Sequence, residues 1–597
     1  MMLKLTQGTG GGHAVSELIL GHNIEMCLTT ADGLLSDRLR NPKFLGPPHP
    51  MTGIAPHWLG SSFGNAAYEL TPFAGLAGSE AQQIRVFQPS GGRHLVQNKI
   101  QVRAGETLEL EIWARPRHAP VTLKAVLLQL PSGTTPYDSG EIVVDKPYYQ
   151  RYTLPLTASR DDNEAILSLN IVGLGQVWID QVHLRPKDEP LLCKAVVETM
   201  KVMRIPTLRF PGGIISNAYH WRHGTGPVHL RPAALDAAFH HDWHLNYDFG
   251  LDEYLRLCVD QKIVPALTFN IATGTPEEAT EMAAYCAAWF RNAGVEAPRI
   301  YWHVGNHPFC WDTSHMTPAM YANVLKAFVP GVKAAYQNSR IVAVMGDAFE
   351  ADPGKACWRE TLLAEAADLI DVVEVQVYGG GDPLAAPGEQ VSKLAESLAD
   401  VEPNLRAFIK LCRSRNVRWN VGIAEWNMWI QASHWDGRAF EEPSTVLHGL
   451  YIAGMIRRFA ALGPDFEVAH FYNLVNCMGI LNHRGADVEV TDAVRIFNLY
   501  RRALPGRFVP LDLTGGAEGE TLTVEALGLE NDEGSFIFLT SRSPDEAAQV
   551  SLAGLVRDGA VCTGFRGVSP AGTFMRIEPQ MAGDTVELPP LSVLRIR

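Results

Sequence analysis

The first candidate for chemistry is a carboxylate at the end of an apolar run. Glu425 follows the residues VGIA, and Trp426, Asn427 and Trp429 come directly after it. Aromatic faces stack on sugar rings, and a carboxylate beside them can attack or protonate a glycosidic bond. The same glutamate could instead cap a following helix or pair with a neighbouring arginine. The local pattern alone leaves these interpretations open.

The second candidate is the segment YWHVGNHPFC, which carries residue types that also bind zinc. His303 and His307 are four residues apart, and Cys310 and His315 follow. This spacing is not a recognised zinc site. At a strand rise of about 3.3 Å per residue, the two histidines would lie roughly 13 Å apart unless the chain bends after Gly305. We therefore predict no metal site and no cofactor.

Both candidates fall in a region where strand-like and helix-like segments alternate. Between about residues 187 and 503, apolar runs such as VPALTFN, RIVAVMG and VAHFYNLV alternate with helical-period segments such as PEEATEMAAYCAAWFRNAG. Seven to eight such units predict a (β/α)8 barrel. Reactive residues of this fold follow the carboxyl ends of the strands, where Glu425 and His307 are expected to lie.

The rest of the chain consists mainly of strand-like segments, so the predicted fold class is α/β plus all-β. Residues 45–186 contain period-2 segments and few helical signals, which predicts a β-sandwich or jelly roll inserted before the barrel. Residues 504–597 predict a C-terminal β-sandwich, and residues 1–44 a strand and linker associated with that sandwich or with the barrel. Aromatic residues of the insert could stack on glycan or pack internally; they are Trp113, Tyr148, Tyr149, Tyr152 and Trp178.

A histidine-rich stretch is expected in loops at the barrel mouth, where one or two members could touch a substrate. Its members are His220, His223, His229, His240, His241 and His244.

Long ordered motifs then give a specific resemblance over nearly the whole chain. They include GHNIEMC, LRFPGG, YHWRHGTGP, LNYDFGLDEYLRLC, YWHVGN, VYGG, AEWNMW and AHFYNLVNCMGIL. The chain resembles the α-L-arabinofuranosidases of glycoside hydrolase family 51, which are retaining (β/α)8 glycosidases. The resemblance implies a glycoside, oligosaccharide or polysaccharide substrate.

Carried over position by position, the resemblance implies a set of site residues. Glu425 occupies the place of the nucleophile and His307 that of the acid/base. Glu25, Asn306 and Tyr378 match residues around the sugar. Further candidate substrate-binding residues are Gln376, Trp426 and Trp302; for Trp302 a core position is an equal alternative.

The sequence departs from the family at the acid/base, where Gly305 and Asn306 are followed by His307 instead of glutamate. Ile214 and Gln376 replace an asparagine and a histidine of the usual pattern. Three explanations are open for His307. The imidazole replaces the carboxylate; the leaving group is good, or another carboxylate such as Asp312 or Glu350 reaches in; or catalysis is lost and a carbohydrate-binding protein remains.

Composition limits the partners. Lys and Arg number 51 against 65 Asp and Glu, a net charge of −14, so nucleic acid is not an expected partner. The sequence contains no apolar run of transmembrane length, and the first 20 residues lack the pattern of a signal peptide. We expect no membrane association, a cytoplasmic location and, from the resemblance, a homo-oligomer as one option.

Overall fold

The structure is a computed structural model. It describes residues 2–26, 32–61, 63–89, 92–129, 135–189, 191–235, 244–310, 314–345, 353–381, 385–430, 444–515, 523–557 and 559–597.

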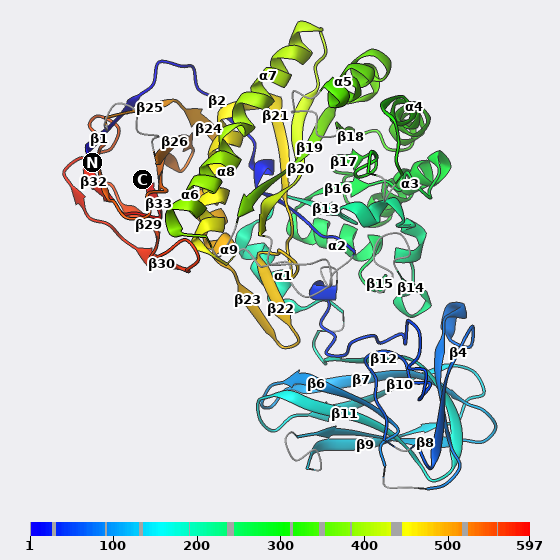
Figure 1. Cartoon of the computed structure of the whole chain (residues 1–597). Coiled ribbons are helices and arrows are strands. Elements are labelled where there is room, and N and C mark those ends of the chain that lie inside the picture. Colours follow the sequence, from blue (N-terminus) through cyan, green and yellow to red (C-terminus); the bar gives the residue numbers. More distant parts are fainter. Residues whose placement is uncertain are drawn as a thin grey trace.

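The centre of the molecule is a closed barrel of parallel strands, which confirms the predicted fold class (Figure 1). In order around the ring these are β13 (Thr207–Phe210), β16 (Val264–Thr268), β17 (Ile300–His303), β18 (Ser339–Val344), β19 (Val372–Gly381), β20 (Asn420–Ile430), β21 (Phe466–Phe471) and β3 (Gly21–Asn23). β3 is the first in the chain and closes the ring between β21 and β13. The strands are almost fully buried because helices cover their outer side and side chains fill the interior.

Helices follow most of the strands and form the outer layer. They are α1 (Lys194–Met203), α2 (Leu251–Gln261), α3 (Pro276–Asn292), α4 (Pro318–Ala335), α5 (Pro353–Glu365), α6 (Pro387–Ala399), α7 (Val401–Ser414), α8 (Val446–Leu462) and α9 (Asp492–Arg501). Helix α3 shows why they start where they do: Thr275 accepts a hydrogen bond from the backbone N–H of Glu278, and proline occupies the first helical position. No helix within the described ranges is long and apolar enough to cross a membrane.

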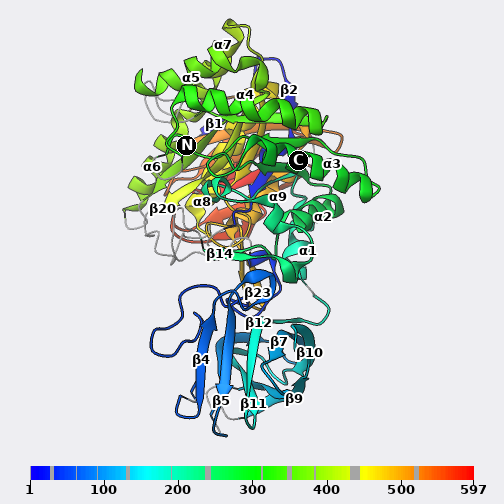
Figure 2. The same ribbon diagram turned by 90° about the vertical axis from the view of Figure 1, so that its right-hand side faces the viewer.

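The segment between β3 and α1 contains a separate two-layer β domain, which we call the insert (Figures 1 and 2). One sheet has the order β10–β7–β12–β5–β4, formed by β4 (Ala66–Thr71), β5 (Ala81–Val86), β7 (Thr107–Pro116), β10 (Gln150–Thr157) and β12 (Gly175–Pro186). The other has the order β6–β11–β8–β9, formed by β6 (Leu95–Val102), β8 (Val121–Leu128), β9 (Pro136–Val144) and β11 (Asp162–Val172). Alternate apolar residues of the two sheets face each other and form a core of their own.

A second two-layer β domain follows the barrel and includes the first strands of the chain. Its five-stranded sheet contains β25 (Leu511–Gly515), β1 (Met2–Gln7), β28 (Ala548–Ser551), β32 (Thr585–Leu588) and β31 (Met581–Ala582). Its seven-stranded sheet contains β2 (His13–Val15), β24 (Gly506–Val509), β26 (Val524–Asn531), β27 (Gly534–Ser541), β33 (Ser592–Ile596), β29 (Cys562–Gly567) and β30 (Phe574–Ile577). Two short hairpins, β14 (Ala233–Leu235) with β15 (His244–Asn246) and β22 (Leu481–Arg484) with β23 (Asp487–Val490), extend from the barrel.

Charged and aromatic contacts join the insert to the barrel. The buried Lys43 ammonium lies 2.6 Å from the carboxylate of Asp248, which is also buried. Arg103 pairs with Asp487 on the β22–β23 hairpin at 2.5 Å. The ring of His229 stacks on Trp113, with 4.4 Å between centroids. Trp113 therefore packs against the barrel, and its indole N–H is bonded to Glu111 within the insert.

Candidate active site

The predicted site residues come from four barrel strands and meet at one end of the ring. Glu25 lies two residues beyond β3, and Asn306 and His307 lie just beyond β17. Gln376 and Tyr378 are near the end of β19, and Glu425 is on β20. Because the strands are parallel, these positions share the carboxyl end of the barrel, where this fold places its chemistry.

A bulge in β20 orients Glu425. Val375 pairs with Ile423, but the next pair is Gln376 with Glu425, so Ala424 is an extra residue in its strand. The Ala424 carbonyl accepts a hydrogen bond at 2.7 Å from Asn23, which lies on β3. The bulge therefore directs the Glu425 side chain into the site while its backbone remains hydrogen bonded.

Arg209 and Tyr378 hold the Glu425 carboxylate. One oxygen accepts a hydrogen bond from Arg209 at 2.9 Å, and the other accepts one from the Tyr378 hydroxyl at 2.8 Å. Glu425 is only 5% exposed and Arg209 is fully buried. The carboxylate is thus fixed by two hydrogen-bond donors in a water-poor site, the arrangement that a nucleophilic carboxylate requires.

A second carboxylate, Glu25, lies beside the first. A Cβ built on Gly213 would lie 2.8 Å from Oε1 of Glu425 and 2.9 Å from Oε1 of Glu25. Both carboxylates therefore lie directly against this glycine. Burial and, next, the charge of Glu425 raise the pKa of Glu25 to about 7. Glu25 also accepts hydrogen bonds from the Tyr472 hydroxyl and from the backbone N–H of Ile215. Burial beside Glu425 therefore favours the protonated form of Glu25.

A chain of amides links Arg209 to His307. Oδ1 of Asn306 accepts a hydrogen bond from Arg209 at 2.7 Å and a second from Nε2 of Gln376 at 3.0 Å. This fixes the Gln376 amide, because its Oε1 must then face Nε2 of His307, with which it is bonded. Nε2 of His307 therefore donates to Gln376, and this hydrogen bond fixes the orientation of the imidazole.

The turn after β17 sets the direction of His307. Gly305 has φ of 80° and His307 has φ of 43°, so the chain bends twice through the left-handed region. A Cβ on Gly305 would lie 2.2 Å from Ile271, which requires glycine there. This bend brings His307 to Gln376, while His303 remains inside the barrel.

His303 belongs to a layer beneath the site. It is buried and its Nδ1 donates to Glu374, which is two residues before Gln376 on β19. Burial lowers the pKa of His303. Burial would raise the pKa of Glu374, but His303 and Arg209 hold it below its ordinary value. A neutral imidazole thus donates to an ionised carboxylate, which adds a negative charge near Arg209.

An apolar wall adjoins the two carboxylates. Tyr378 contacts Trp429 and Tyr472 edge-on, with ring centroids 5.6 and 6.3 Å apart, and Met478 packs against the same group. Tyr472 and Tyr378 also bond to Glu25 and Glu425 respectively. The wall therefore combines aromatic surface with hydroxyl groups, as a sugar site requires.

Two candidate substrate contacts, Trp302 and Trp426, lie in the barrel core, which is the alternative that the sequence left open for Trp302. Trp302 is fully buried, stacks on Phe269 at 5.1 Å and donates its indole N–H to Ser339. Trp426 is fully buried among aromatic rings of α8, β21 and α9. Alternation along the strand explains Trp426, because Glu425 points inward and its neighbour must point outward.

The histidine-rich stretch is only partly described. His220 bonds to Glu278 at 3.0 Å, and His223 packs edge-on against Tyr247. The predictions for His240 and His241, and for Asp312 and Glu350 as replacement acids, concern residues outside the described ranges, as does the side chain of His244. Within those ranges no group of three or more His, Cys, Asp or Glu residues is arranged to hold a metal ion.

Sequence reasoning missed several members of the site. Arg209, in the run TLRF, is an arginine inside an apolar strand, and such a residue needs a buried partner. An arginine at such a position could have been recognised from the sequence as a candidate site residue. Asn217 bonds to both backbone groups of Asn306 from a 3-10 turn, and nothing in its local sequence indicates this contact.

Comparisons with known proteins find relatives named as arabinofuranosidases. A family model described as "Alpha-L-arabinofuranosidase 1 domain" matches residues 199–293. The chain is 27% identical over 366 residues to a probable α-L-arabinofuranosidase C of Aspergillus niger, covering 56% of this chain and 70% of that protein. It is 22% identical over 396 residues to an intracellular exo-α-L-arabinofuranosidase of Bacteroides ovatus, covering 60% and 74%.

A solved structure extends the likeness to the whole fold. The arabinose-bound GH51 α-L-arabinofuranosidase MgGH51 superposes with a TM-score of 0.74 at 15% identity, over 100% of this chain and 99% of the other. The named relatives and the matched barrel together identify this chain as an α-L-arabinofuranosidase-like glycoside hydrolase with the fold of family 51.

Proposed function

We propose that this chain removes α-L-arabinofuranosyl groups from glycans by a retaining double displacement. The observation that carries the proposal is the buried Glu425 carboxylate, held on one oxygen by Arg209 and on the other by Tyr378. Such a group is ionised, desolvated and pre-oriented, so it can attack an anomeric carbon without reorganisation.

In the first step, Glu425 forms a bond to the anomeric carbon while the glycosidic C–O bond breaks. The proton for the departing oxygen comes from Nδ1 of the His307 imidazolium. In the second step, water attacks the glycosyl ester and gives its proton to Nδ1, which releases the sugar and restores Glu425. The bond between Nε2 of His307 and Gln376 is kept throughout, so the imidazole retains its orientation.

The glycone is held by groups whose hydrogen-bonding capacity fits sugar hydroxyls. Nδ2 of Asn306 is buried and has no partner among the described residues, so it is a donor in need of an acceptor. Glu25 can donate or accept, because its pKa is about 7. Tyr378 adds an aromatic edge. We assign no substrate contact to Trp302 or Trp426.

The test compares leaving groups in the wild type and in His307→Ala. Loss of the acid should lower turnover of unactivated arabinofuranosides by about 10²–10⁴-fold and that of nitrophenyl arabinofuranosides far less. His49→Ala, which removes an exposed histidine in the segment before β4, is the matched control. Equal losses on both substrates would exclude His307 as the acid/base.

Glu425 is tested by trapping. A mechanism-based arabinofuranosyl inhibitor should form a stable ester with Glu425 in the wild type, and Glu425→Gln should abolish both the label and turnover. Binding of arabinosides without any label or hydrolysis would favour the alternative, a carbohydrate-binding protein on this scaffold.

The proposal also includes a cytoplasmic location. The name of the Bacteroides ovatus relative describes that protein as intracellular, which supports this assignment. We further propose glycosides as the only ligand class for this site, without nucleic acid or membrane partners.

A further inference from the structure

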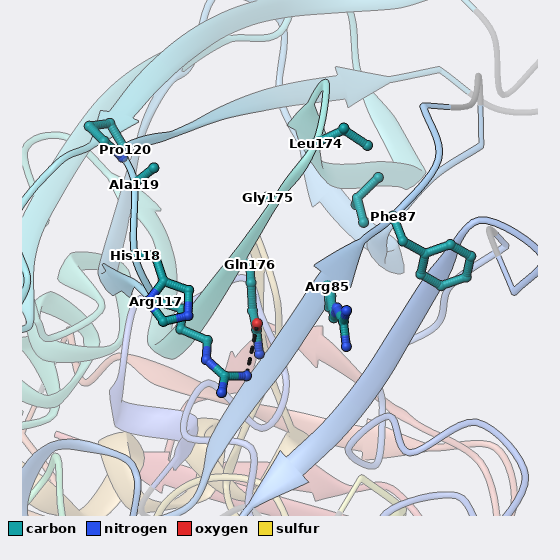
Figure 3. Close-up of a pocket in the computed structure, with 10 residues that line it drawn as sticks. Arg85, Phe87, Arg117, His118, Ala119, Pro120, Leu174, Gly175 and Gln176 are labelled. Atoms are coloured by element: carbon teal, nitrogen blue, oxygen red, sulfur yellow. Dashed lines mark hydrogen bonds between the residues drawn. The ribbon is translucent and has the colours of Figure 1, made fainter.

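The insert carries a cavity that is separate from the barrel site. Its volume is about 550 Å³, within the usual range for small-molecule sites. It lies over the ends of β5, β7 and β12, and its lining residues include Arg85, Gln176 and Arg117 (Figure 3). The size suits one or two sugar rings.

The three polar residues form a row across adjacent strands. Gln176 pairs directly with Arg85, and the backbone N–H of Arg117 donates to the Gln176 carbonyl. Residues in such a row project from the same face of a sheet. Because neighbouring strands are about 4.8 Å apart, the two arginines start roughly 10 Å from each other with the amide between them. Ile84 and Val86 point into the core, so the row lies on the solvent face.

The charge of this cavity is opposite to that of the chain. The ten described residues that line it include two arginines and His118 but no aspartate or glutamate. The whole chain has a net charge of −14. No lysine is among these ten lining residues. The guanidinium groups of the two arginines match the planar, two-oxygen geometry of a carboxylate.

Apolar side chains border the same cavity. Phe87 is 53% exposed and Leu174 is 62% exposed. Figure 3 shows Phe87 beside Arg85 and Leu174 near the start of β12. An exposed phenyl ring next to cations provides a surface for the C–H face of a sugar.

The rest of this sheet face is occupied by the protein itself. Arg115 lies over the rings of Trp178 and Tyr149, at 4.3 and 5.3 Å from their centroids. The Tyr149 hydroxyl donates to the Ala74 carbonyl, and Asp180 holds the turn at Leu76. Tyr149 and Trp178, two of the aromatic residues that could stack on glycan, are therefore used in packing, and the face opens at the row of Arg85, Gln176 and Arg117.

We propose that this cavity binds a uronic-acid unit of an acidic glycan. Arg85 and Arg117 pair with the sugar carboxylate, and Phe87 packs against the ring. The Gln176 amide accepts a hydrogen bond from Arg117 at 3.2 Å and donates one to Gln83 at 2.5 Å, so it positions the Arg117 guanidinium. The choice of a saccharide over other carboxylates rests on the proposed glycosidase function. Binding would hold the chain on glycans that carry both arabinofuranosyl and uronate groups.

The experiment is calorimetric titration of the full-length protein with tri-galacturonate at low salt. We expect binding that weakens at least tenfold in the Arg85→Ala/Arg117→Ala double variant and at higher ionic strength. Arg160→Ala, which removes an exposed arginine elsewhere in the insert, is the matched control and should bind like the wild type. The same trisaccharide with its carboxyl groups reduced should not bind.

Several outcomes would overturn the inference. They are equal binding of the acidic and reduced trisaccharides, unchanged binding by the double variant, and full competition by inorganic phosphate at equal concentration, which would indicate a general anion site. Arabinofuranoside hydrolysis is measured in parallel and should not change in the double variant. Hydrolysis without uronate binding refutes this inference alone, whereas uronate binding without hydrolysis refutes the proposed function alone.

Discussion

Replacement of Gly213 by alanine should impair catalysis with little effect on folding. The added Cβ would lie 2.8 Å from Oε1 of Glu425 and 2.9 Å from Oε1 of Glu25. To reach an ordinary contact distance of 3.4 Å, Glu425 must move by about 0.6 Å. The φ of Gly213 is −79°, so the strain comes from this contact and not from a left-handed backbone.

The expected loss of kcat follows from how little displacement a positioned nucleophile tolerates. A displacement of about 1 Å costs on the order of 10²-fold in rate, so a shift of this size should lower kcat by about 10- to 100-fold. Arg209 and Tyr378 resist the shift, since each is bonded to the Glu425 carboxylate. KM should change less than kcat because the glycone contacts of Asn306 are not displaced.

The assay is steady-state hydrolysis of nitrophenyl α-L-arabinofuranoside, with calorimetry to confirm folding. Gly380→Ala is the matched control: a Cβ there meets no atom within 4 Å, and its φ is not left-handed. If Gly213→Ala keeps kcat within twofold of the wild type, the two carboxylates do not lie against this glycine and the described site is wrong.

Three further predictions concern charge. Glu25 has a folded pKa of about 7, above its ordinary value of 4.5, so its stabilising contribution is complete below about pH 4.5 and lost as pH rises through 7. Glu25→Gln should remove up to about 3 kcal/mol of this pH dependence; identical calorimetric pH profiles for the two proteins would contradict it. Tyr378→Phe removes a hydrogen bond to an ionised carboxylate and should lower kcat by roughly 10- to 100-fold, measured on the nitrophenyl substrate. Lys43→Met leaves the buried Asp248 carboxylate with the more distant Arg185, 3.8 Å away, as its remaining cation and should cost up to about 3–5 kcal/mol in denaturant unfolding. Adding Asp248→Asn should recover part of that loss, and an additive double variant would show that the pair is not coupled.

The sequence predicted the parts of the fold that repeat locally. Alternation of strand-like and helical periods was enough for the barrel, and the ends of its strands gave Glu425 and His307. Contacts between distant segments were not accessible in this way. The bulge at Ala424, for example, depends on a hydrogen bond from Asn23 that joins the two ends of the barrel sequence.

Side-chain direction was the second limit. Trp426 and Glu425 are adjacent, and the aromatic cluster around Glu425 suggested that both face the substrate. Only the register of β20 shows that they point to opposite sides. Likewise, the sequence indicated only that Gln376 replaces a histidine of the family pattern. In the structure, the side-chain amide of Gln376 connects Asn306 to His307.

The position of β3 has a consequence for biosynthesis. This strand is made before the whole insert, yet its neighbour β21 is made near the end of the barrel, and the Tyr472 hydroxyl that bonds Glu25 is 447 residues further along the chain. At a translation rate of 5–20 residues per second, that interval lasts roughly 20–90 s. The insert, with its own core, is complete long before then. The nascent barrel therefore remains open between β3 and β21 during this interval, and the pocket around Glu25 is completed only after Tyr472 has been made.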